Sequence, residues 1–261
     1  MSALPVLILA GSRDGAQDPL ARLGGVSHKA LLPVAGQAML SRVLAAVNET
    51  PAISSVTVSI EEPELIQTLL HEHSTHAQPA SVLQSQPSPS ESVADALQAL
   101  GTPCLVTTAD HALLKKEWIE EFLEYTQGCD VAAAIAVRPV IERDVPGTKR
   151  TYIRLSDMHF SGCNLFWLGS PKAQNVITLW NRLQQDRKKP LRMARTLGWS
   201  VLLRALFRKL DSYTLCKRIE TLTGAKVRLV PLSDGCAAVD VDKPVDLTLV
   251  EALLSAPPTQ H

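Results

Sequence analysis

Three residues near the start of the chain are of types that hold phosphate. A short apolar run, Val6–Leu9, ends abruptly at Ala10-Gly11, which is typical of a buried parallel strand that enters a tight turn. Gly11 has no Cβ, so the backbone there can approach a ligand closely. Successive N–H groups of such a turn form a concavity that suits phosphate oxygens, and Arg13 and Lys29 add positive charge nearby. The sequence therefore predicts a phosphate-binding turn, with an ordinary strand–turn–helix unit as the alternative.

Two carboxylates far apart in the chain could hold a divalent cation beside that phosphate. Asp110 follows the apolar run Pro103–Thr108, and Asp242 closes an Asp-Val-Asp segment near the C-terminus. Mg²⁺ takes carboxylate and phosphate oxygens together with water, so the two residues predict a magnesium site. The alternative for Asp110 is an N-cap of the following helix. Pro244 and Asp246 are expected to begin the last helix.

A polar loop, Gln86–Val93, opens another predicted helix. Its residues Ser90 and Ser92 are good N-cap candidates, and a helix N-terminus attracts anions. Helix capping and contact with a nucleotide are therefore equally open for these two serines.

The order of strand and helix signals brings the residues named so far to one edge of a sheet. Runs typical of strands alternate with segments that have the apolar spacing of helices: strands at 6–9, 55–60, 80–83, 103–108 and 129–137, and helices at 39–47, 62–70, 90–100 and 115–125. This alternation predicts a parallel sheet with helices on both faces. Ligands bind beyond the carboxyl ends of such strands, where Gly11 and Asp110 would lie. Alternating residues in 152–168 predict further strands of a mixed sheet.

Length and composition indicate one globular enzyme domain over residues 1–255. The chain has 261 residues, of which 46% are hydrophobic and 20% charged, enough for a sizeable core. Its five cysteines are scattered without C-x-x-C spacing, which argues against a disulfide framework or a zinc site and fits a reducing cytoplasm. Neither a membrane-spanning stretch nor a signal peptide is expected. The tail at 256–261 is expected to be disordered.

A strongly basic segment, residues 182–218, lies within a helical insertion expected at 171–224. It holds eleven basic and two acidic residues, a net charge of +9 in a chain whose formal charge is zero. Apolar residues between 197 and 210 interleave with these charges, a pattern typical of a basic amphipathic helix on an anionic membrane. A lid over a phosphorylated acceptor and a packed insertion with a solvated basic face are the alternatives. The few aromatic residues argue against nucleic-acid binding.

Three segments of the chain resemble a known family. Leu-Ala-Gly-Ser-Arg at 9–13, followed by Lys-Ala-Leu-Leu-Pro-Val-Ala-Gly-Gln-Ala-Met-Leu at 29–40, is similar to the signature of the molybdenum-cofactor guanylyl- and cytidylyltransferases, the MobA-like NTP transferases. Asp-Val-Asp-Lys-Pro-Val-Asp-Leu at 240–247 resembles the family's closing segment. The resemblance implies a GT-A-like fold, a Rossmann-like three-layer sandwich with a mostly parallel, mixed central sheet. Ser12 replaces a second glycine, and 15–28 looks like an insertion.

The resemblance also implies roles for individual residues. Residues expected to bind the nucleotide are Leu9, Ala10, Gly11, Ser12, Arg13, Lys29, Ser90, Ser92 and Asp110. Those expected to be catalytic are Arg13, Lys29 and Asp110, and those expected to hold Mg²⁺ are Asp110 and Asp242. A glycine–x–asparagine lies beside the acceptor in related transferases, which implies the same for Gly162 and Asn164. His111 and Ala112 follow the metal aspartate where the family usually has a proline.

The expected activity is a Mg²⁺-dependent nucleotidyl transfer. A nucleoside triphosphate would donate its NMP to a phosphorylated small-molecule or lipid-like acceptor and release pyrophosphate. The Ser-Val loop and the Asp-Val-Asp ending slightly favour CTP over GTP. A homodimer and a peripheral contact of 182–218 with the inner membrane face are also expected. A glycosyltransferase of the same broad fold that uses a sugar nucleotide, and a non-catalytic nucleotide-binding or membrane-associated scaffold, are the alternatives.

Overall fold

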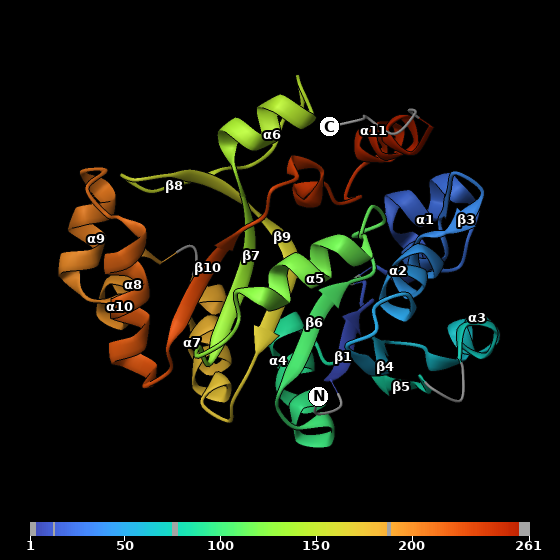
Figure 1. Ribbon diagram of the computed structural model, residues 1–261, viewed down its shortest axis with the longest axis horizontal. Helices are drawn as coiled ribbons and strands as arrows, with labels where there is room; N and C mark the ends of the chain where they lie inside the picture. Colours follow the sequence, from blue (N-terminus) through green and yellow to red (C-terminus); the bar gives the residue numbers. More distant parts are fainter. Residues whose placement is uncertain (1–3, 13, 75–77, 187–188, 256–261) are drawn as a thin grey trace.

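The computed structural model describes residues 4–12, 14–74, 78–186 and 189–255 (Figure 1). Arg13 and the tail at 256–261, both of which the sequence singled out, lie outside the described residues. Within these ranges, no helix is long and apolar enough to cross a membrane.

A central sheet of eight strands, as far as the chain is described, organises the fold (Figure 1). Its order is β10-β7-β9-β6-β1-β4-β5, with the short β8 paired to β9. The strands are β1 (Leu4–Leu9), β4 (Ile53–Ile60), β5 (Ala80–Gln84), β6 (Cys104–Thr108), β7 (Val131–Val137), β8 (Ile153–Arg154), β9 (His159–Leu168) and β10 (Val227–Pro231). A separate two-stranded ribbon joins β2 (Pro33–Val34) to β3 (Gln37–Ala38).

The directions of the strands confirm a mostly parallel, mixed sheet. β5, β4, β1 and β6 run parallel to one another, and β10 runs parallel to β7. β9 lies between β6 and β7 and is antiparallel to both. The carboxyl ends of β5, β4, β1 and β6 therefore meet at one edge of the sheet, as the sequence predicted.

Helices cover both faces of the sheet, which confirms the three-layer architecture (Figure 1). They are α1 (Pro19–Gly24), α2 (Met39–Asn48), α3 (Gln67–His73), α4 (Pro89–Leu100), α5 (Lys116–Glu124), α6 (Arg138–Asp144), α7 (Ala173–Gln185), α8 (Pro190–Leu197), α9 (Trp199–Leu206), α10 (Ser212–Thr223) and α11 (Pro244–Ser255). α2 and α5 pack on one face, and α4 and α7 pack together on the other.

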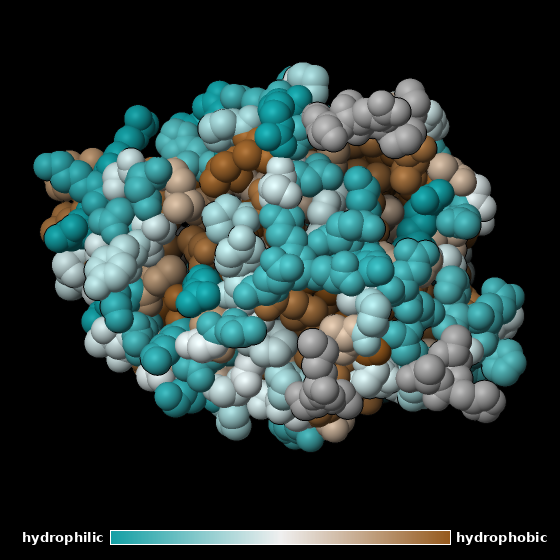
Figure 2. All heavy atoms as spheres, viewed as in Figure 1, coloured by the Kyte–Doolittle hydropathy of each residue, from teal (hydrophilic) through white to brown (hydrophobic). Residues whose placement is uncertain are grey.

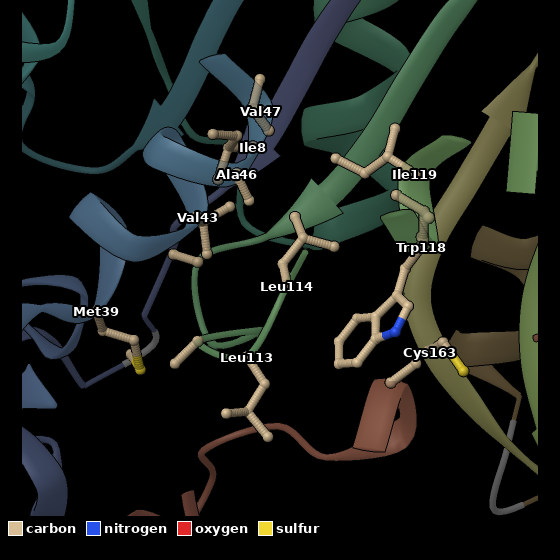
Figure 3. Packing of buried hydrophobic residues seen from close by; sticks show 14 of the residues in the cluster. Ile8, Met39, Val43, Ala46, Val47, Leu113, Leu114, Trp118, Ile119 and Cys163 are labelled. Atoms are coloured by element: carbon tan, nitrogen blue, oxygen red, sulfur yellow. The ribbon is translucent and has the colours of Figure 1, made fainter. Parts of the chain in front are cut away.

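Alternation along β1 shows how the sequence divides these faces. Val6 and Ile8 are buried in the large cluster that α2 and α5 complete, whereas Leu7 is buried with α4 and α7. Successive residues of a strand point to opposite faces, so an uninterrupted apolar run marks a strand that is covered on both sides. Figure 3 shows Ile8 close to Ala46 and Val47 of α2. This large cluster extends from Leu4 to Val250, which supports the proposal of one domain over residues 1–255.

The predicted insertion, 171–224, divides into two parts. α7 belongs to the layer on the sheet, because Ala173 and Ile177 are buried against α4. α8 and α9 pack on each other, and α10 contacts α8, α7 and β10. Figure 1 places α9 at the end of the molecule far from β5.

Candidate active site

The turn after β1 lies between the ends of two neighbouring strands. The backbone N–H of Ala10 donates to Ser59 O at 2.8 Å, and that of Ala109 donates to Leu9 O at 2.9 Å. A Cβ on Gly11 would come within 3.3 Å of a carboxylate oxygen of Glu61. The absence of a Cβ at Gly11 leaves room for the Glu61 carboxylate, and the close approach of a ligand to this turn stays a prediction.

A carboxylate is hydrogen-bonded to the backbone of this turn. Glu61, the residue after β4, accepts a hydrogen bond from the backbone N–H of Ser12. Its other oxygen lies 3.2 Å from His28 Nε2. Glu61 thus already engages a backbone N–H of the turn that the sequence assigned to phosphate.

A pocket of about 470 Å³ opens beside the turn. It lies at the carboxyl ends of β1, β4 and β5 and at the start of α4. Its walls are formed by Leu9, Gly11, Ser12, Ser59, Glu61, Gln84, Ser85, Gln86, Pro87, Ser88, Pro89 and Ser92. This volume falls in the range of small-molecule sites.

The two serines of the α4 loop have different surroundings. Ser92 lines the pocket, and its hydroxyl accepts the backbone N–H of Gln86 at 2.8 Å, which fixes the loop. Ser90 is fully buried and lies 3.2 Å from the Ser88 hydroxyl and 3.4 Å from Gln184 of α7. The structure therefore brings Ser92 but not Ser90 to the pocket wall. The helix N-cap is Ser88, which accepts from the backbone N–H of Glu91.

Lys29 brings the two predicted metal carboxylates together. Its Nζ lies 3.4 Å from Asp110 Oδ2 and 3.1 Å from Asp242 Oδ1, although 213 residues separate Lys29 from Asp242. The lysine side chain is mostly buried, whereas Asp242 is more exposed. We call Asp110 and Asp242 the carboxylate pair. Because both contact one ammonium group, they lie within reach of one cation.

Local interactions fix each of these side chains. Lys29 begins a short 3₁₀ turn that His28 caps by accepting the backbone N–H of Ala30 at 3.1 Å. Asp110 receives the Thr108 hydroxyl at 2.5 Å. The backbone N–H of Val241 donates to the carbonyl of Asp110 at 3.0 Å, which aligns the C-terminal segment with the end of β6.

Asp242 lies outside the strands of the structure. The segment follows a 3₁₀ turn, Gly235–Ala238, and precedes α11. Asp246 accepts the backbone N–H groups of Asp242 at 3.2 Å and Lys243 at 2.9 Å. The prediction that Pro244 and Asp246 begin the last helix is confirmed, since α11 starts at Pro244.

Opposite charges set the direction of the pKa shift of Lys29, and burial sets that of Asp110. Burial lowers the pKa of Lys29, but the charges of Asp110 and Asp242 outweigh it and raise that pKa above its ordinary value. Burial raises the pKa of Asp110, helped by the charges of Asp240 and Asp242 and opposed by Lys29 and Thr108. Two carboxylates thus face one ammonium group, while Asp240 is paired with Arg150.

The carboxylate pair fits a magnesium ion. Mg²⁺ is usually bound by one or two carboxylates and completes its octahedron with substrate phosphates and water. The position between Asp110 and Asp242 already attracts a cation, the Lys29 ammonium. No cluster of three or more His, Cys, Asp or Glu side chains suited to a metal occurs among the described residues. Phosphate and water oxygens would have to supply the remaining ligands.

The turn after Asp110 differs from the usual family pattern in a defined way. His111 is buried, and its ring stacks on Trp118 with ring centroids 5.8 Å apart. Burial lowers the pKa of His111 to about 4, so its ring is neutral near pH 7. The histidine fills the space under the turn without adding charge to the carboxylate pair.

A second polar cluster joins the acceptor candidate to this centre. Asp240 accepts Arg150 Nη2 at 2.7 Å and Asn164 Nδ2 at 3.0 Å. Asn164 has a φ of +47°, next to an irregularity in the pairing of β9 with β7. Gly162 is exposed, with open space where a Cβ would stand. The structure thus brings Asn164 into contact with Asp240, two residues before Asp242 in the chain. Gly162 stays at the open surface of β9.

Several pocket residues were not predicted from the sequence. Glu61 follows β4, and Gln84, Ser85 and Gln86 end or follow β5. They obey the rule that led to Asp110, since polar side chains at the carboxyl ends of parallel strands face the ligand edge. Applied to every strand, that rule would have found them.

The family can be decided by comparison with known proteins. A model of the MobA-like NTP transferase domain matches residues 6–146, more than half of the chain. The chain belongs to this family. The matched region of this MobA-like NTP transferase includes the turn at Gly11, Lys29, Glu61 and Asp110, whereas Asp242 lies beyond it.

Solved structures share the fold over nearly the whole chain. A hypothetical transferase from Thermus thermophilus is 29% identical, with a TM-score of 0.78, and the match covers 95% of this chain and 100% of that one. A 4-diphosphocytidyl-2C-methyl-D-erythritol synthase from Anaerococcus prevotii is 11% identical (TM-score 0.58, 97% and 99% covered). A CMP:2-keto-3-deoxy-manno-octonic acid synthetase complexed with CTP is 14% identical (TM-score 0.59, 97% and 99% covered). The last two show the fold alone, and the search of curated proteins gives no match.

Proposed function

We propose that this MobA-like NTP transferase transfers an NMP from a nucleoside triphosphate to a phosphorylated acceptor and releases pyrophosphate. The observation that carries the proposal is the contact of Asp110 and Asp242 with one ammonium group, Lys29 Nζ, at 3.4 and 3.1 Å. A polar pocket beside Gly11 lies at the same sheet edge. A cation centre beside a glycine turn is the arrangement that a triphosphate requires.

The reaction needs positioning and charge neutralisation more than a base. An oxygen of the acceptor's phosphate attacks the α-phosphorus; a new P–O bond forms there, and the bond to the β-phosphate bridging oxygen breaks. A phosphate monoester is already anionic near neutral pH, so no side chain has to remove a proton. Pyrophosphate leaves with the electrons of the broken bond.

The residues of the chain divide this work. Lys29 would stabilise charge that develops on the α-phosphate, and the turn at Gly11 with Arg13 would hold the β- and γ-phosphates. Asp110 and Asp242 would hold Mg²⁺, which offsets charge on the phosphates and the leaving group. The 470 Å³ pocket, with Ser92 in its wall, would take the nucleoside.

Asn164, Gly162 and Arg150 would form the acceptor side. Arg150 is held by Asp240 at 2.7 Å, close to the centre, so its guanidinium could orient an acceptor phosphate. Small-molecule and lipid-like acceptors are both compatible with this arrangement. The slight preference for CTP over GTP expected from the Ser-Val loop is kept, as is the predicted contact of residues 182–218 with an inner membrane face. A homodimer also stays part of the proposal.

A pyrophosphate-release assay tests the function. The protein is incubated with Mg²⁺, each NTP in turn and a panel of phosphorylated acceptors. We expect Asp110→Ala and Lys29→Ala to lower turnover at least about a hundredfold, because a positioned charge contributes roughly 3 kcal/mol to such a transition state. Both variants should keep the circular dichroism of the native fold.

The same assay separates the alternatives. A glycosyltransferase would release a nucleoside diphosphate from a sugar nucleotide, and a scaffold would release nothing from either donor. Unchanged pyrophosphate release in the Asp110 and Lys29 variants would overturn the assignment of the site.

A further inference from the structure

The face of α9 that points away from the sheet is apolar. Trp199, Leu203, Leu206 and Phe207 are 58%, 48%, 72% and 67% exposed. Residues spaced by three, four and seven lie on one side of a helix, so the first three form a single stripe, with Phe207 at its end. A helix on a globular protein normally turns such a stripe toward the core. α9 has the reverse orientation.

This orientation is fixed by what α9 packs against. Val201, the buried residue of α9, lies in one cluster with Ile135 of β7 and Phe160 of β9. The chain after α9 is attached to the β8–β9 turn, because the backbone N–H of Ser156 donates to the carbonyl oxygen of Leu210 at 2.8 Å. Ser212 also donates to Asp157 with its backbone N–H at 3.0 Å. The helix therefore cannot roll its apolar stripe inward without breaking these contacts.

Exposed basic residues lie before, within and just after α9 in the chain. Arg195, Arg204, Arg208 and Lys209 are exposed. In the described part of 182–218, the ion pairs join Arg192 to Asp186 at 3.5 Å and Lys217 to Glu220 at 2.8 Å. Asp211 lies near Arg204, but its carboxylate already caps α10 through Thr214 N at 2.7 Å. In Figure 2, brown and teal residues adjoin at the margin where Figure 1 places α9.

We propose that α9 with Phe207, Arg208 and Lys209 docks on the surface of an anionic lipid bilayer. Apolar side chains of an interfacial helix enter the boundary between headgroups and acyl chains, and Lys and Arg contact the lipid phosphates. Both groups are present here, on α9 and on the three residues that follow it. A second copy of the chain fits less well, because a two-fold contact would bring the like charges of both patches together.

The bilayer would lie next to the proposed acceptor side. Val201 of α9 packs in one cluster with Ile135 of β7. Ile135 pairs with Gly162 on the neighbouring strand β9. Asn164 follows two residues later on the same strand. The inference thus deepens the proposed function, on which this last step rests: the acceptor would be a phosphate presented at a membrane surface.

Vesicle flotation tests the docking and needs no nucleotide. We expect the full chain to float at low salt with vesicles of phosphatidylcholine and phosphatidylglycerol, but not with phosphatidylcholine alone. High salt should weaken binding, because it screens exposed charges. The tryptophan emission should shift to the blue with anionic vesicles, and Trp199→Phe should remove most of that shift.

Paired variants separate the two contributions. Leu206→Ser with Phe207→Ser should lower vesicle affinity about tenfold or more, because two large apolar side chains no longer leave water. Arg208→Glu with Lys209→Glu should remove the preference for anionic vesicles. Leu23→Ser with Tyr125→Ser, two exposed apolar residues elsewhere, and Arg22→Glu with Lys226→Glu, two exposed basic ones, serve as matched controls.

Three results would overturn the docking. These are failure to float with anionic vesicles at low salt, equal binding by the α9 and control variants, and a dimer in sedimentation that Leu206→Ser with Phe207→Ser turns into monomer. The last would assign the face to a second copy. Pyrophosphate release with soluble acceptors is measured separately, so failure of docking is distinguishable from failure of the transfer reaction.

Discussion

Charged and apolar side chains differ in burial between the sheet with its carboxylate pair and α9. Lys29 is mostly buried and lies within 3.4 Å of two carboxylates, whereas Arg208 and Lys209 point to solvent beside α9. Apolar residues follow the same division. α5, a helix of similar length, buries Trp118, Ile119 and Phe122 against the sheet, while α9 buries one residue.

This difference separates side chains that find their contacts within the folded chain from side chains that stay free to contact a partner. The sheet edge pairs its charges within the chain, Lys29 with Asp110 and Asp242 and Arg150 with Asp240. α9 leaves both a stripe of apolar surface and a group of cations uncovered. A contiguous exposed apolar patch with polar residues at its rim is typical of an interaction site.

The largest expected effect compares the two helices directly. Phe122→Ala should lower the free energy of unfolding by about 3–5 kcal/mol, because it leaves a cavity under α5. Leu206→Ala should change it by less than about 0.5 kcal/mol, because the side chain already faces water. Urea unfolding without ligand measures both. A loss near that of Phe122→Ala for Leu206→Ala would mean that the outer face of α9 is packed in solution.

The next effect concerns the carboxylate pair. Asp242→Asn should raise the Mg²⁺ concentration for half-maximal pyrophosphate release at least about tenfold. Even changes to residues that only contact a metal ligand can lower metal affinity by that factor. Asp246→Asn is the matched control, because Asp246 accepts backbone N–H groups of the same segment and an amide oxygen can do the same. Chelation should abolish release until Mg²⁺ is restored. An equal Mg²⁺ requirement in both variants would remove Asp242 from the metal site.

The smallest effect concerns the carboxylate that already contacts the turn. Glu61→Gln should lower the KM for the NTP about fivefold, because two unit charges 4 Å apart in water repel by about 1 kcal/mol. Turnover at saturation should stay unchanged, and glutamine can still accept the Ser12 N–H. The assay compares all four NTPs. A KM that rises for one NTP alone would show instead that Glu61 recognises the base.

Much of the site could be predicted because it depends on a rule of sheet geometry. Gly11 and Asp110 follow apolar runs that become adjacent parallel strands, so their meeting at one edge follows from the strand pattern. The meeting of Asp242 with them did not follow from periodicity, since its segment lies outside the strands; the family's closing motif indicated it. Arg13 lies outside the described residues and stays a prediction.

The remaining differences come from contacts that a linear pattern does not contain. Ser90 and Ser92 lie two residues apart, and only the packing of α7 on α4 determines that Ser90 meets Gln184 instead of the pocket. Glu61 reaches Ser12 because β4 and β1 are neighbours, which the order of strands along the chain does not reveal. The outward stripe of α9 depends in the same way on its attachment through Val201.

The antiparallel pairing of β6 with β9 divides the sheet into two halves that are each continuous in the chain. β5, β4, β1 and β6 all come from residues 4–108, and β9, β7 and β10 all come from residues 131–231. The first half carries the pocket beside Gly11 and the second the acceptor candidates Gly162 and Asn164, and the two halves join at four residue pairs from Cys104–Leu168 to Thr107–Leu165. Under the proposed function, a crossover near residue 110 would exchange the acceptor candidates together with Asp242, and the new second half would have to restore the contact of Asp242 with Lys29.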